Sequence, residues 1–498
     1  MIRRIVILCL TLVFAVILFY VTLPAIHLGN PGLYLYLGAI VLFYYISINA
    51  TKENILFIIK EETIPLNKSF LFLPIVVCVI GSFLLLINFV CSPVFHATSY
   101  VNRIGINQNH EFVKDVEELA LDSIPVFDAD TSKTIGNKTF EDAEDWDNRF
   151  YVSDSYTLIN YNDSLLRIAP IEYTSYHDWS KNRKEGIKGY VSVNSTSGVA
   201  EVVSLDQGIK YTKSAYFGDN VKRKLRFKYP THIFGEMTFE IDEEGNPYWI
   251  VPTLRYTAIG LNPDVKSVIL LNAITGETTE YAVEDVPSWV DHIYYAELVT
   301  KQINHWRKYK DGFLNGLFGK SSVATTTEKY NYIAMKGSIY VYSSIASPVA
   351  STTNDGFILT NLRTKESNYY PISNVLENNA MNTVKSLESG FNVSYPLLVN
   401  ISDRPTYLMN IRDNSNQIIK YALMDATDEN IVSISEASLG IEATIEIYNK
   451  KQMNNSLSSD GIEDIITIKK IKNAVINGNT NYYITDTKNK KYVVDIVM

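Results

Sequence analysis

Long stretches of apolar residues fill most of the first 92 positions of the chain. Three of them, Ile5–Ile26, Leu33–Ala50 and Phe70–Val90, contain no charged residue. A hydrocarbon core roughly 30 Å thick is spanned by about 20 apolar residues in a helix, so each stretch is long enough to cross it. A cleavable signal peptide accounts for the first stretch at most, because two more follow it. The pattern predicts a transmembrane region of three helices in residues 1–92.

Lysine and arginine near the three stretches predict their orientation. The segment between the first two stretches has neither residue, and the cations that flank the other ends are Arg3, Arg4, Lys52, Lys60 and Lys68. The positive-inside rule therefore places the N-terminus and residues 51–69 in the cytoplasm. Three spans then place residues 93–498 outside a cell membrane, in an extracytoplasmic position.

Beyond residue 92 the pattern changes to short runs in which apolar and polar residues alternate, which is typical of half-buried strands. The same pattern of an alternating run, a tight turn and a second alternating run recurs at 189–203, 268–281, 357–366 and 421–429. In the first copy Gly198 supplies the positive φ that such a turn commonly needs. Another hairpin, 238–251, turns through Gly245 and Pro247. The exterior part is therefore expected to contain antiparallel sheets.

Segments with a helical period lie between these strands. They predict helices over 110–121, over 289–309 with Ser288 as N-cap, and over 374–387. Segments without a clear period are predicted to be loops or linkers, at 128–146, 311–319 and 450–459. The final stretch alternates again and predicts a small all-β unit, a barrel of four or five strands within 460–498.

Composition supports a strand-rich exterior and disfavours a nucleic-acid partner. The 34 tyrosines suit pleated, half-buried surfaces, and the net charge of −9 leaves no basic stripe for phosphates. One local exception, 222–228, holds five cations, and its alternation with Leu225 and Phe227 predicts the solvated face of a strand. The cysteines lie only in or beside the apolar stretches, at Cys9, Cys78 and Cys91. An exterior without thiols is compatible with an exported domain.

A search for catalytic and metal-binding patterns yields no candidate site, so no catalytic, cofactor-binding or metal-binding residue is predicted. Four exterior histidines stand singly, without the pairing of a zinc hydrolase, at His177, His232, His292 and His305. Asp291-His292 is the most site-like pair, but adjacent residues of the predicted helix would point in different directions. Two acidic clusters, 242–244 and 141–147, match no calcium loop and are interpreted as solvated turns.

One segment carries a family resemblance. Ile241-Asp-Glu-Glu-Gly-Asn-Pro-Tyr-Trp249 followed by Leu271-Asn-Ala-Ile-Thr-Gly-Glu277 resembles the sheet of PepSY-type modules, best over residues 239–281. Asn272 stands where that family commonly has Asp. The resemblance implies small extracytoplasmic α+β domains whose motifs are structural, with a binding or inhibitory role and no catalysis.

These observations give one expected organisation. The transmembrane region is followed by extracytoplasmic α+β modules, each an antiparallel sheet with packed helices, and then by the small all-β unit. The expected boundaries are 93–230 for a first module, 231–330 for a PepSY-like module, 331–449 for a second PepSY-like module and 460–498 for the β unit.

The expected function is that of a multi-pass, membrane-anchored binding or scaffold protein of the cell envelope. Its expected partners are the lipid bilayer and a protein or envelope polymer outside the membrane, and no enzyme activity or cofactor is expected. Two alternatives stay open. A cell-envelope hydrolase needs a carboxylate pair drawn from distant positions, which sequence cannot pair. An accessory subunit of a membrane complex would assemble through the three helices.

Overall fold

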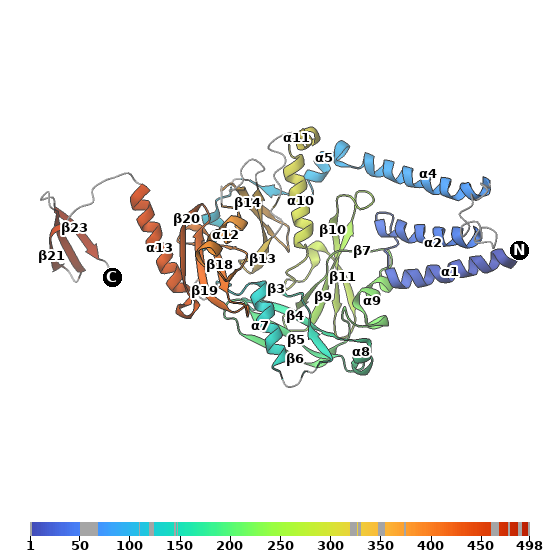
Figure 1. The fold of residues 1–498 in the computed structure, drawn as a ribbon, viewed down its shortest axis with the longest axis horizontal. Coiled ribbons are helices and arrows are strands. Elements are labelled where there is room, and N and C mark those ends of the chain that lie inside the picture. The colour runs from blue at the N-terminus through green and yellow to red at the C-terminus, as the bar shows by residue number, and fades with distance from the viewer. Residues whose placement is uncertain are drawn as a thin grey trace.

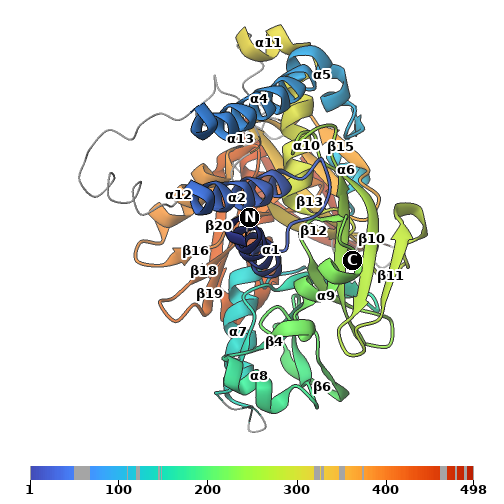
Figure 2. The same cartoon turned by 90° about the vertical axis from the view of Figure 1, so that its right-hand side faces the viewer.

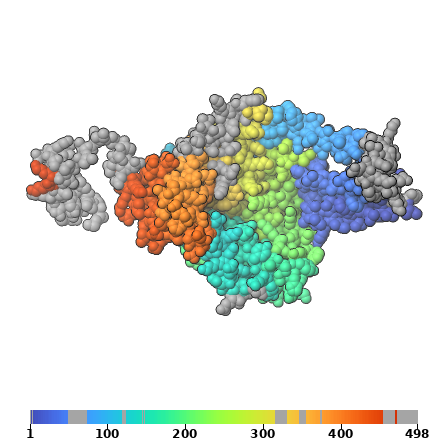
Figure 3. Space-filling model, viewed as in Figure 1, coloured from blue at the N-terminus to red at the C-terminus, as the bar shows by residue number. Residues whose placement is uncertain are grey.

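The computed structural model describes residues 2–49, 68–108, 110–118, 124–143, 146, 148–318, 326, 330–346, 354–372, 375–459, 468–476, 479–486 and 491–496. Figure 1 shows an elongated molecule with three N-terminal helices projecting from one end and the C-terminal strands at the other. The space-filling view in Figure 3 gives the same outline.

The prediction of three long apolar helices is confirmed. They are α1 (Ile2–Thr22), α2 (Pro31–Asn49) and α4 (Lys68–Val90), each long and apolar enough to cross a membrane. Most of their large apolar side chains are exposed, as lipid-facing positions would be. Helices α1 and α2 form a pair in which the rings of Phe14 and Phe43 stack 4.2 Å apart, whereas α4 runs separately (Figures 1 and 2).

The folded domain contacts one end of this helical region. After α1, the Ile26 N–H donates to the Pro230 carbonyl at 2.8 Å. Near the end of α4, the Asn88 side chain exchanges two hydrogen bonds of 3.1 and 3.0 Å with the backbone of Ile259. The start of α1, the end of α2 and the start of α4 lie away from the domain (Figure 1). The 23–30 connection therefore lies on the domain side of the helices.

The described residues of the domain form four five-stranded sheets, each built on a meander of four consecutive antiparallel strands with one short strand added. The first sheet comprises β2 (Phe150–Val152), β3 (Thr157–Tyr161), β4 (Ser164–Tyr173), β5 (Ile187–Asn194) and β6 (Ala200–Ile209). The second comprises β7 (Ile233–Phe234), β8 (Thr238–Ile241), β9 (Pro247–Arg255), β10 (Asp264–Asn272) and β11 (Thr278–Ala282). The third comprises β1 (Ile106–Asn107), β12 (Asn331–Met335), β13 (Ser338–Ala346), β14 (Asn354–Asn361) and β15 (Ser367–Tyr370). The fourth comprises β16 (Asn392–Val393), β17 (Leu397–Ile401), β18 (Arg404–Arg412), β19 (Ile418–Asp425) and β20 (Asp428–Glu436).

The predicted hairpins are confirmed as the last two strands of each meander, and β8–β9 is confirmed as the hairpin at 238–251. In the first three sheets an asparagine opens the turn, and its Oδ1 accepts the backbone N–H groups two and three residues later, at Asn194, Asn272 and Asn361. Four residues after each asparagine the backbone is left-handed, with φ of 71°, 74° and 64° at Gly198, Gly276 and Lys365. Sequence segment 331–449 contains the fourth sheet and the four-stranded meander of the third, whereas β1 joins the third sheet from earlier in the chain.

Side chains on the two faces of each inner sheet pack that sheet against the sheets before and after it in the chain. On β9, Trp249 and Val251 lie in the core shared with the first sheet, whereas Ile250 and Leu254 lie in the core shared with the third. The third and fourth sheets share another core, and α13 (Gly440–Ser459) covers the outer face of the fourth. Because successive strand residues point to opposite faces, one apolar run serves two cores.

Several predicted loops are helices instead. Segment 128–146 contains α7 (Ala129–Glu141), which Asp128 caps by accepting the Thr131 N–H. The buried face of α7 includes Thr131, Ser132 and Gly136, so a search for apolar periodicity does not detect it. Segment 311–319 contains α11 (Phe313–Phe318), and 450–459 is the last part of α13.

The basic segment 222–228 is also helical, not a strand. It lies in α9 (Val221–Lys228), where Val221 and Leu225 are buried one turn apart and Phe227 is exposed. The four-residue spacing of the two buried side chains, not the alternation of Leu225 with Phe227, determines the structure.

The remaining helices start or end differently from the prediction. The helix predicted at 289 begins at Ala296, as α10 (Ala296–Tyr309), so Ser288 is not its N-cap. Within 110–121 the described residues form only the short α6 (Phe112–Asp115). Helix α12 (Glu377–Leu387) confirms the prediction over 374–387 from residue 377 onward, since 374 lies outside the described residues.

The C-terminal unit is all-β, as predicted. Its described residues form a three-stranded antiparallel sheet of β21 (Ile468–Ile476), β22 (Asn479–Asp486) and β23 (Lys491–Ile496), in place of the expected barrel of four or five strands.

Candidate functional site

The pair Asp291-His292 lies in the extended segment before α10, not on a helix. Both side chains are buried, with 5% and 4% of their surface exposed. Asp291 Oδ2 accepts the backbone N–H of Asn160 at 2.7 Å, and His292 Nε2 lies 2.7 Å from the Leu158 carbonyl. Because a carbonyl only accepts, His292 Nε2 carries the proton. Both residues therefore attach to β3 of the first sheet.

Glu240, on β8, holds the same segment from the second sheet. It is fully buried, and its carboxylate accepts the backbone N–H groups of Asp291 at 2.8 Å and His292 at 3.2 Å. Burial, above all, raises the pKa of Glu240, and burial together with the charge of Glu240 raises the pKa of Asp291. Two carboxylates in such a site do not both ionise readily, so the pair retains a proton near neutral pH.

Arg363, in the turn of the third sheet that Asn361 opens, completes this arrangement. Its guanidinium donates to the carbonyls of Val286, Pro287 and Val290 at 2.6 to 2.7 Å. Segment 286–292 is thus bound to the first, second and third sheets. The most site-like pair of the sequence is part of a structural junction between modules.

A small cavity of about 200 Å³ adjoins this junction and includes His292 in its wall. Burial lowers the pKa of His292 and of Lys213, and raises the pKa of Glu236, Tyr156 and Tyr332. These shifts favour the neutral form of each group.

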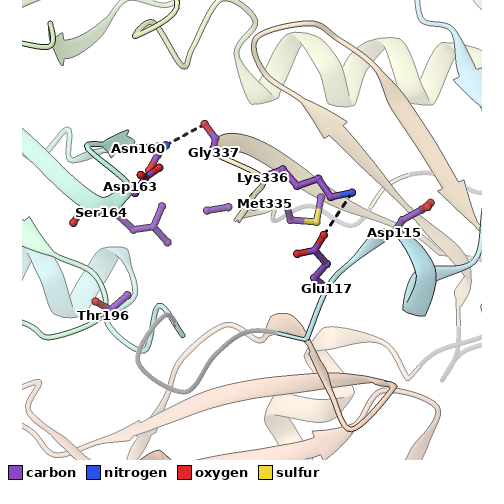
Figure 4. Close-up of a pocket in the computed structure, with 11 residues that line it drawn as sticks. Asp115, Glu117, Asn160, Asp163, Ser164, Thr196, Met335, Lys336 and Gly337 are labelled. Carbon is purple, nitrogen blue, oxygen red and sulfur yellow. Dashed lines mark hydrogen bonds and ion pairs between the residues drawn. The ribbon is translucent and has the colours of Figure 1, made fainter.

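A larger cavity of about 320 Å³ lies where the first and third sheets meet the chain segment around α6. Its wall combines the β3–β4 turn with the β12–β13 turn, as Figure 4 shows. The Asn160 side-chain amide donates to the Gly337 carbonyl at 3.2 Å and closes one side. Lys336 Nζ lies 3.9 Å from Glu117 Oε1 across another part of the wall. We call this space the inter-module cavity.

Three carboxylates and one lysine give the inter-module cavity an acidic character. Asp163 and Glu117 are exposed at it, and Asp115 is partly buried. Asp115 Oδ2 already accepts the Tyr370 hydroxyl at 3.1 Å and lies 2.5 Å from His110 Nδ1. Asp163 has no comparable contact and stands in a left-handed turn with φ of 59°. The cavity thus offers oxygen acceptors to hydroxyl or amine donors of a ligand, and its lining includes no histidine or cysteine.

The junction and the inter-module cavity share Asn160. Its backbone N–H binds the buried Asp291, while its side chain forms part of the cavity wall. The position of this wall therefore depends on the junction behind it. Sequence reasoning missed Asn160, Asp163 and Lys336, whose only signal was their place in or beside hairpin turns.

The other residues named from the sequence have structural places. Asp242 Oδ1 accepts the backbone N–H groups of Glu244 and Asn246 at 3.1 and 2.8 Å, which makes the 242–244 cluster a turn. His232 lies 3.2 Å from Glu280, and His177 is exposed on α8 (Tyr176–Asn182).

His305 packs edge-on against Tyr100, and burial lowers its pKa to about 4. Cluster 141–147 begins at the end of α7 and lies partly outside the described residues. Within the described part of the chain, no three His, Cys, Asp or Glu side chains are grouped to hold a metal ion.

Comparisons with known proteins add little to this geometry. No known protein family and no curated protein matches the sequence. A solved structure described as a polysaccharide lyase, Uly1, aligns over 69% of this chain and 76% of its own, with 8% identity and a TM-score of 0.16. A TM-score that low supports neither a shared fold nor a shared activity.

Proposed function

We propose that this chain is a multi-pass, membrane-anchored extracytoplasmic binding protein of the cell envelope. Its first module and its second PepSY-like module hold a polar envelope ligand in the inter-module cavity without covalent chemistry. The observation that supports this proposal is the cavity itself, whose wall is contributed by three separate parts of the chain and is rich in hydrogen-bond acceptors.

The arrangement of the buried acids favours binding over hydrolysis. A glycosidase needs two carboxylates that reach the scissile bond from an accessible cleft. Glu240 and Asp291 are the carboxylates with strongly raised pKa values, yet both are buried and accept backbone N–H groups. These two carboxylates join sheets, so we assign ligand binding to the inter-module cavity.

Soluble peptidoglycan fragments are a suitable probe because they carry both hydroxyl and amine donors. We expect the detergent-solubilised full chain to bind them in a calorimetric titration, and Asp163→Asn to weaken binding several-fold. Asn tolerates the left-handed turn, so this change removes charge without straining the backbone.

Asp403→Asn is the matched control. Asp403 occupies the same left-handed turn position, also with φ of 59°, in the fourth sheet, and it is not part of the cavity lining. Binding should be unchanged in this variant. Absence of binding by the unmodified chain, or equal loss in both variants, would refute the cavity as the site. Turnover of the fragments would instead favour the hydrolase alternative.

A further inference from the structure

Helix α9 places a basic surface beside the membrane-spanning helices. Five of its eight residues are cations: Lys222, Arg223, Lys224, Arg226 and Lys228. Among the described residues, none of the five forms an ion pair with a carboxylate. In a chain of net charge −9, a cluster of cations without acidic partners favours binding of negative charge from outside the protein.

Aromatic contacts fix α9 against the domain-side end of α1. The guanidinium of Arg223 lies 4.3 Å from the ring centre of Tyr20, and the exposed Phe227 ring lies 6.1 Å from Phe19. Figure 1 shows α9 next to the end of α1, where the helix leaves the apolar region. An exposed phenylalanine among cations, at the end of a membrane-spanning helix, is typical of a membrane–water interface.

Arg226 is the most deeply placed of these cations. It is 4% exposed and donates to the carbonyls of Leu23, Tyr229, Pro230 and His232 at 2.7 to 3.2 Å. Carbonyl oxygens satisfy hydrogen bonds but do not neutralise the charge. Burial accordingly lowers the pKa of Arg226 to about 10. Its Nη2 makes no hydrogen bond to the described residues, so it is free to bind an anion.

A cavity of about 450 Å³ connects this arginine with the membrane-spanning helices. On the domain side its wall includes Lys222 and Arg226. On the membrane side it is formed by apolar residues of the last turns of α1 and the first turns of α2, among them Leu18, Leu35 and Ala39. The cavity is therefore cationic at one end and apolar at the other.

We infer that this cavity binds one anionic phospholipid, with its phosphate at Lys222 and Arg226 and an acyl chain along α1 and α2. A phosphate group accepts hydrogen bonds from arginine and lysine together, and an acyl chain fits the apolar wall. The inference rests on the membrane-anchored part of the proposed function and is independent of ligand binding in the inter-module cavity.

The test uses the full chain, delipidated in a neutral detergent. Phosphatidylglycerol or phosphatidylcholine is added, and the lipid retained per protein after gel filtration is measured by mass spectrometry. We expect one tightly held phosphatidylglycerol and no retained phosphatidylcholine. Loss of one cation should weaken phosphatidylglycerol retention about fivefold, and charge reversal should weaken it further.

Lys222→Glu is the preferred variant, because Arg226 also supports the backbone around α9 and its replacement would endanger folding. Lys184→Glu, which reverses an exposed lysine that does not line the cavity, is the matched control and should retain lipid normally. Ala39→Phe, which fills the apolar end, should also reduce retention while leaving all charges intact. Equal retention of the two lipids, or equal behaviour of Lys222→Glu and Lys184→Glu, would overturn the inference.

Discussion

Two buried aspartates, Asp264 and Asp291, lie where sheets meet. Asp264, at the start of β10, accepts Lys365 Nζ at 2.6 Å and Arg255 at 3.2 Å, and it lies 3.6 Å from Arg103 after α5 (Pro93–Val101). Despite its burial, these donors lower the pKa of Asp264. Asp291 has the opposite balance, because burial and the neighbouring Glu240 carboxylate outweigh the Asn160 N–H, His292 and Arg363. The surroundings thus favour the charged carboxylate at one junction and the neutral one at the other.

This contrast predicts the pH dependence of stability at Asp291. Because its pKa is raised in the folded state, folding binds a proton that the unfolded chain releases above about pH 4. The contribution of Asp291 to the free energy of unfolding therefore decreases as pH rises through the raised pKa. Asp291→Asn should remove this dependence, so the variant should gain about 1 kcal/mol or more relative to the unmodified protein between pH 5 and pH 8.

The measurement is denaturant unfolding of the detergent-solubilised chain across this pH range. Glu240, His292 and Arg363 also face this carboxylate. Because Glu240 and Asp291 interact, loss of the Asp291 charge also brings the pKa of Glu240 closer to its ordinary value, which changes stability in the same direction. Asp206→Asn replaces an exposed acid on β6, and its free energy of unfolding should have the same pH dependence as that of the unmodified protein. The same pH dependence in Asp291→Asn would contradict the raised pKa of Asp291.

Elements with strong local patterns were predictable from the sequence. The three apolar helices were predictable from the length of their uncharged stretches. The hairpins were predictable from the alternation of apolar and polar residues and from the asparagines that open their turns. Helix α7 was not, since Thr131, Ser132 and Gly136 bury its inner face without an apolar signal. The candidate site was not predictable either, because Asn160 and Lys336 come from different sheets and are brought together only by stacking. Asp291-His292 stood out correctly as unusual, but its contacts are structural.

The repeated turn gives a prediction at the scale of a single element. At Gly276 the φ is 74°, and a Cβ added there would lie 2.3 Å from the Tyr211 ring. Gly276→Ala combines an unfavourable backbone conformation with a steric clash, so it should destabilise the chain by about 1–3 kcal/mol. Gly218→Ala is the matched control, because a Cβ there meets no atom within 4 Å and its φ is not positive. Equal thermal unfolding of the two variants would show that the second sheet tolerates disruption of this turn.

At the scale of the whole molecule, sheets that follow one another in the chain share cores, and the second to fourth sheets lead away from the helices. The second sheet lies near the helices, the fourth lies beyond the third, and the C-terminal strands are farthest away (Figure 1). Each inner sheet is buried on both faces, so the modules form one continuous body. Such a body holds the inter-module cavity at a fixed position relative to the three N-terminal helices.

Orientation in the membrane is the last property to test. Arg3 and Arg4 lie in the first turn of α1, at the end away from the domain, and predict that this end is cytoplasmic. The cations of α9 do not oppose this, because the rule counts short loops and α9 belongs to a long folded domain. Green fluorescent protein, which is exported through the general secretion route without becoming fluorescent, should therefore be bright when fused before Met1 and dark when fused after Met498. Alkaline phosphatase at the same two positions should give the reverse pattern. Fluorescence at the C-terminal fusion together with an inactive phosphatase there would place the stacked sheets in the cytoplasm and refute the proposed topology.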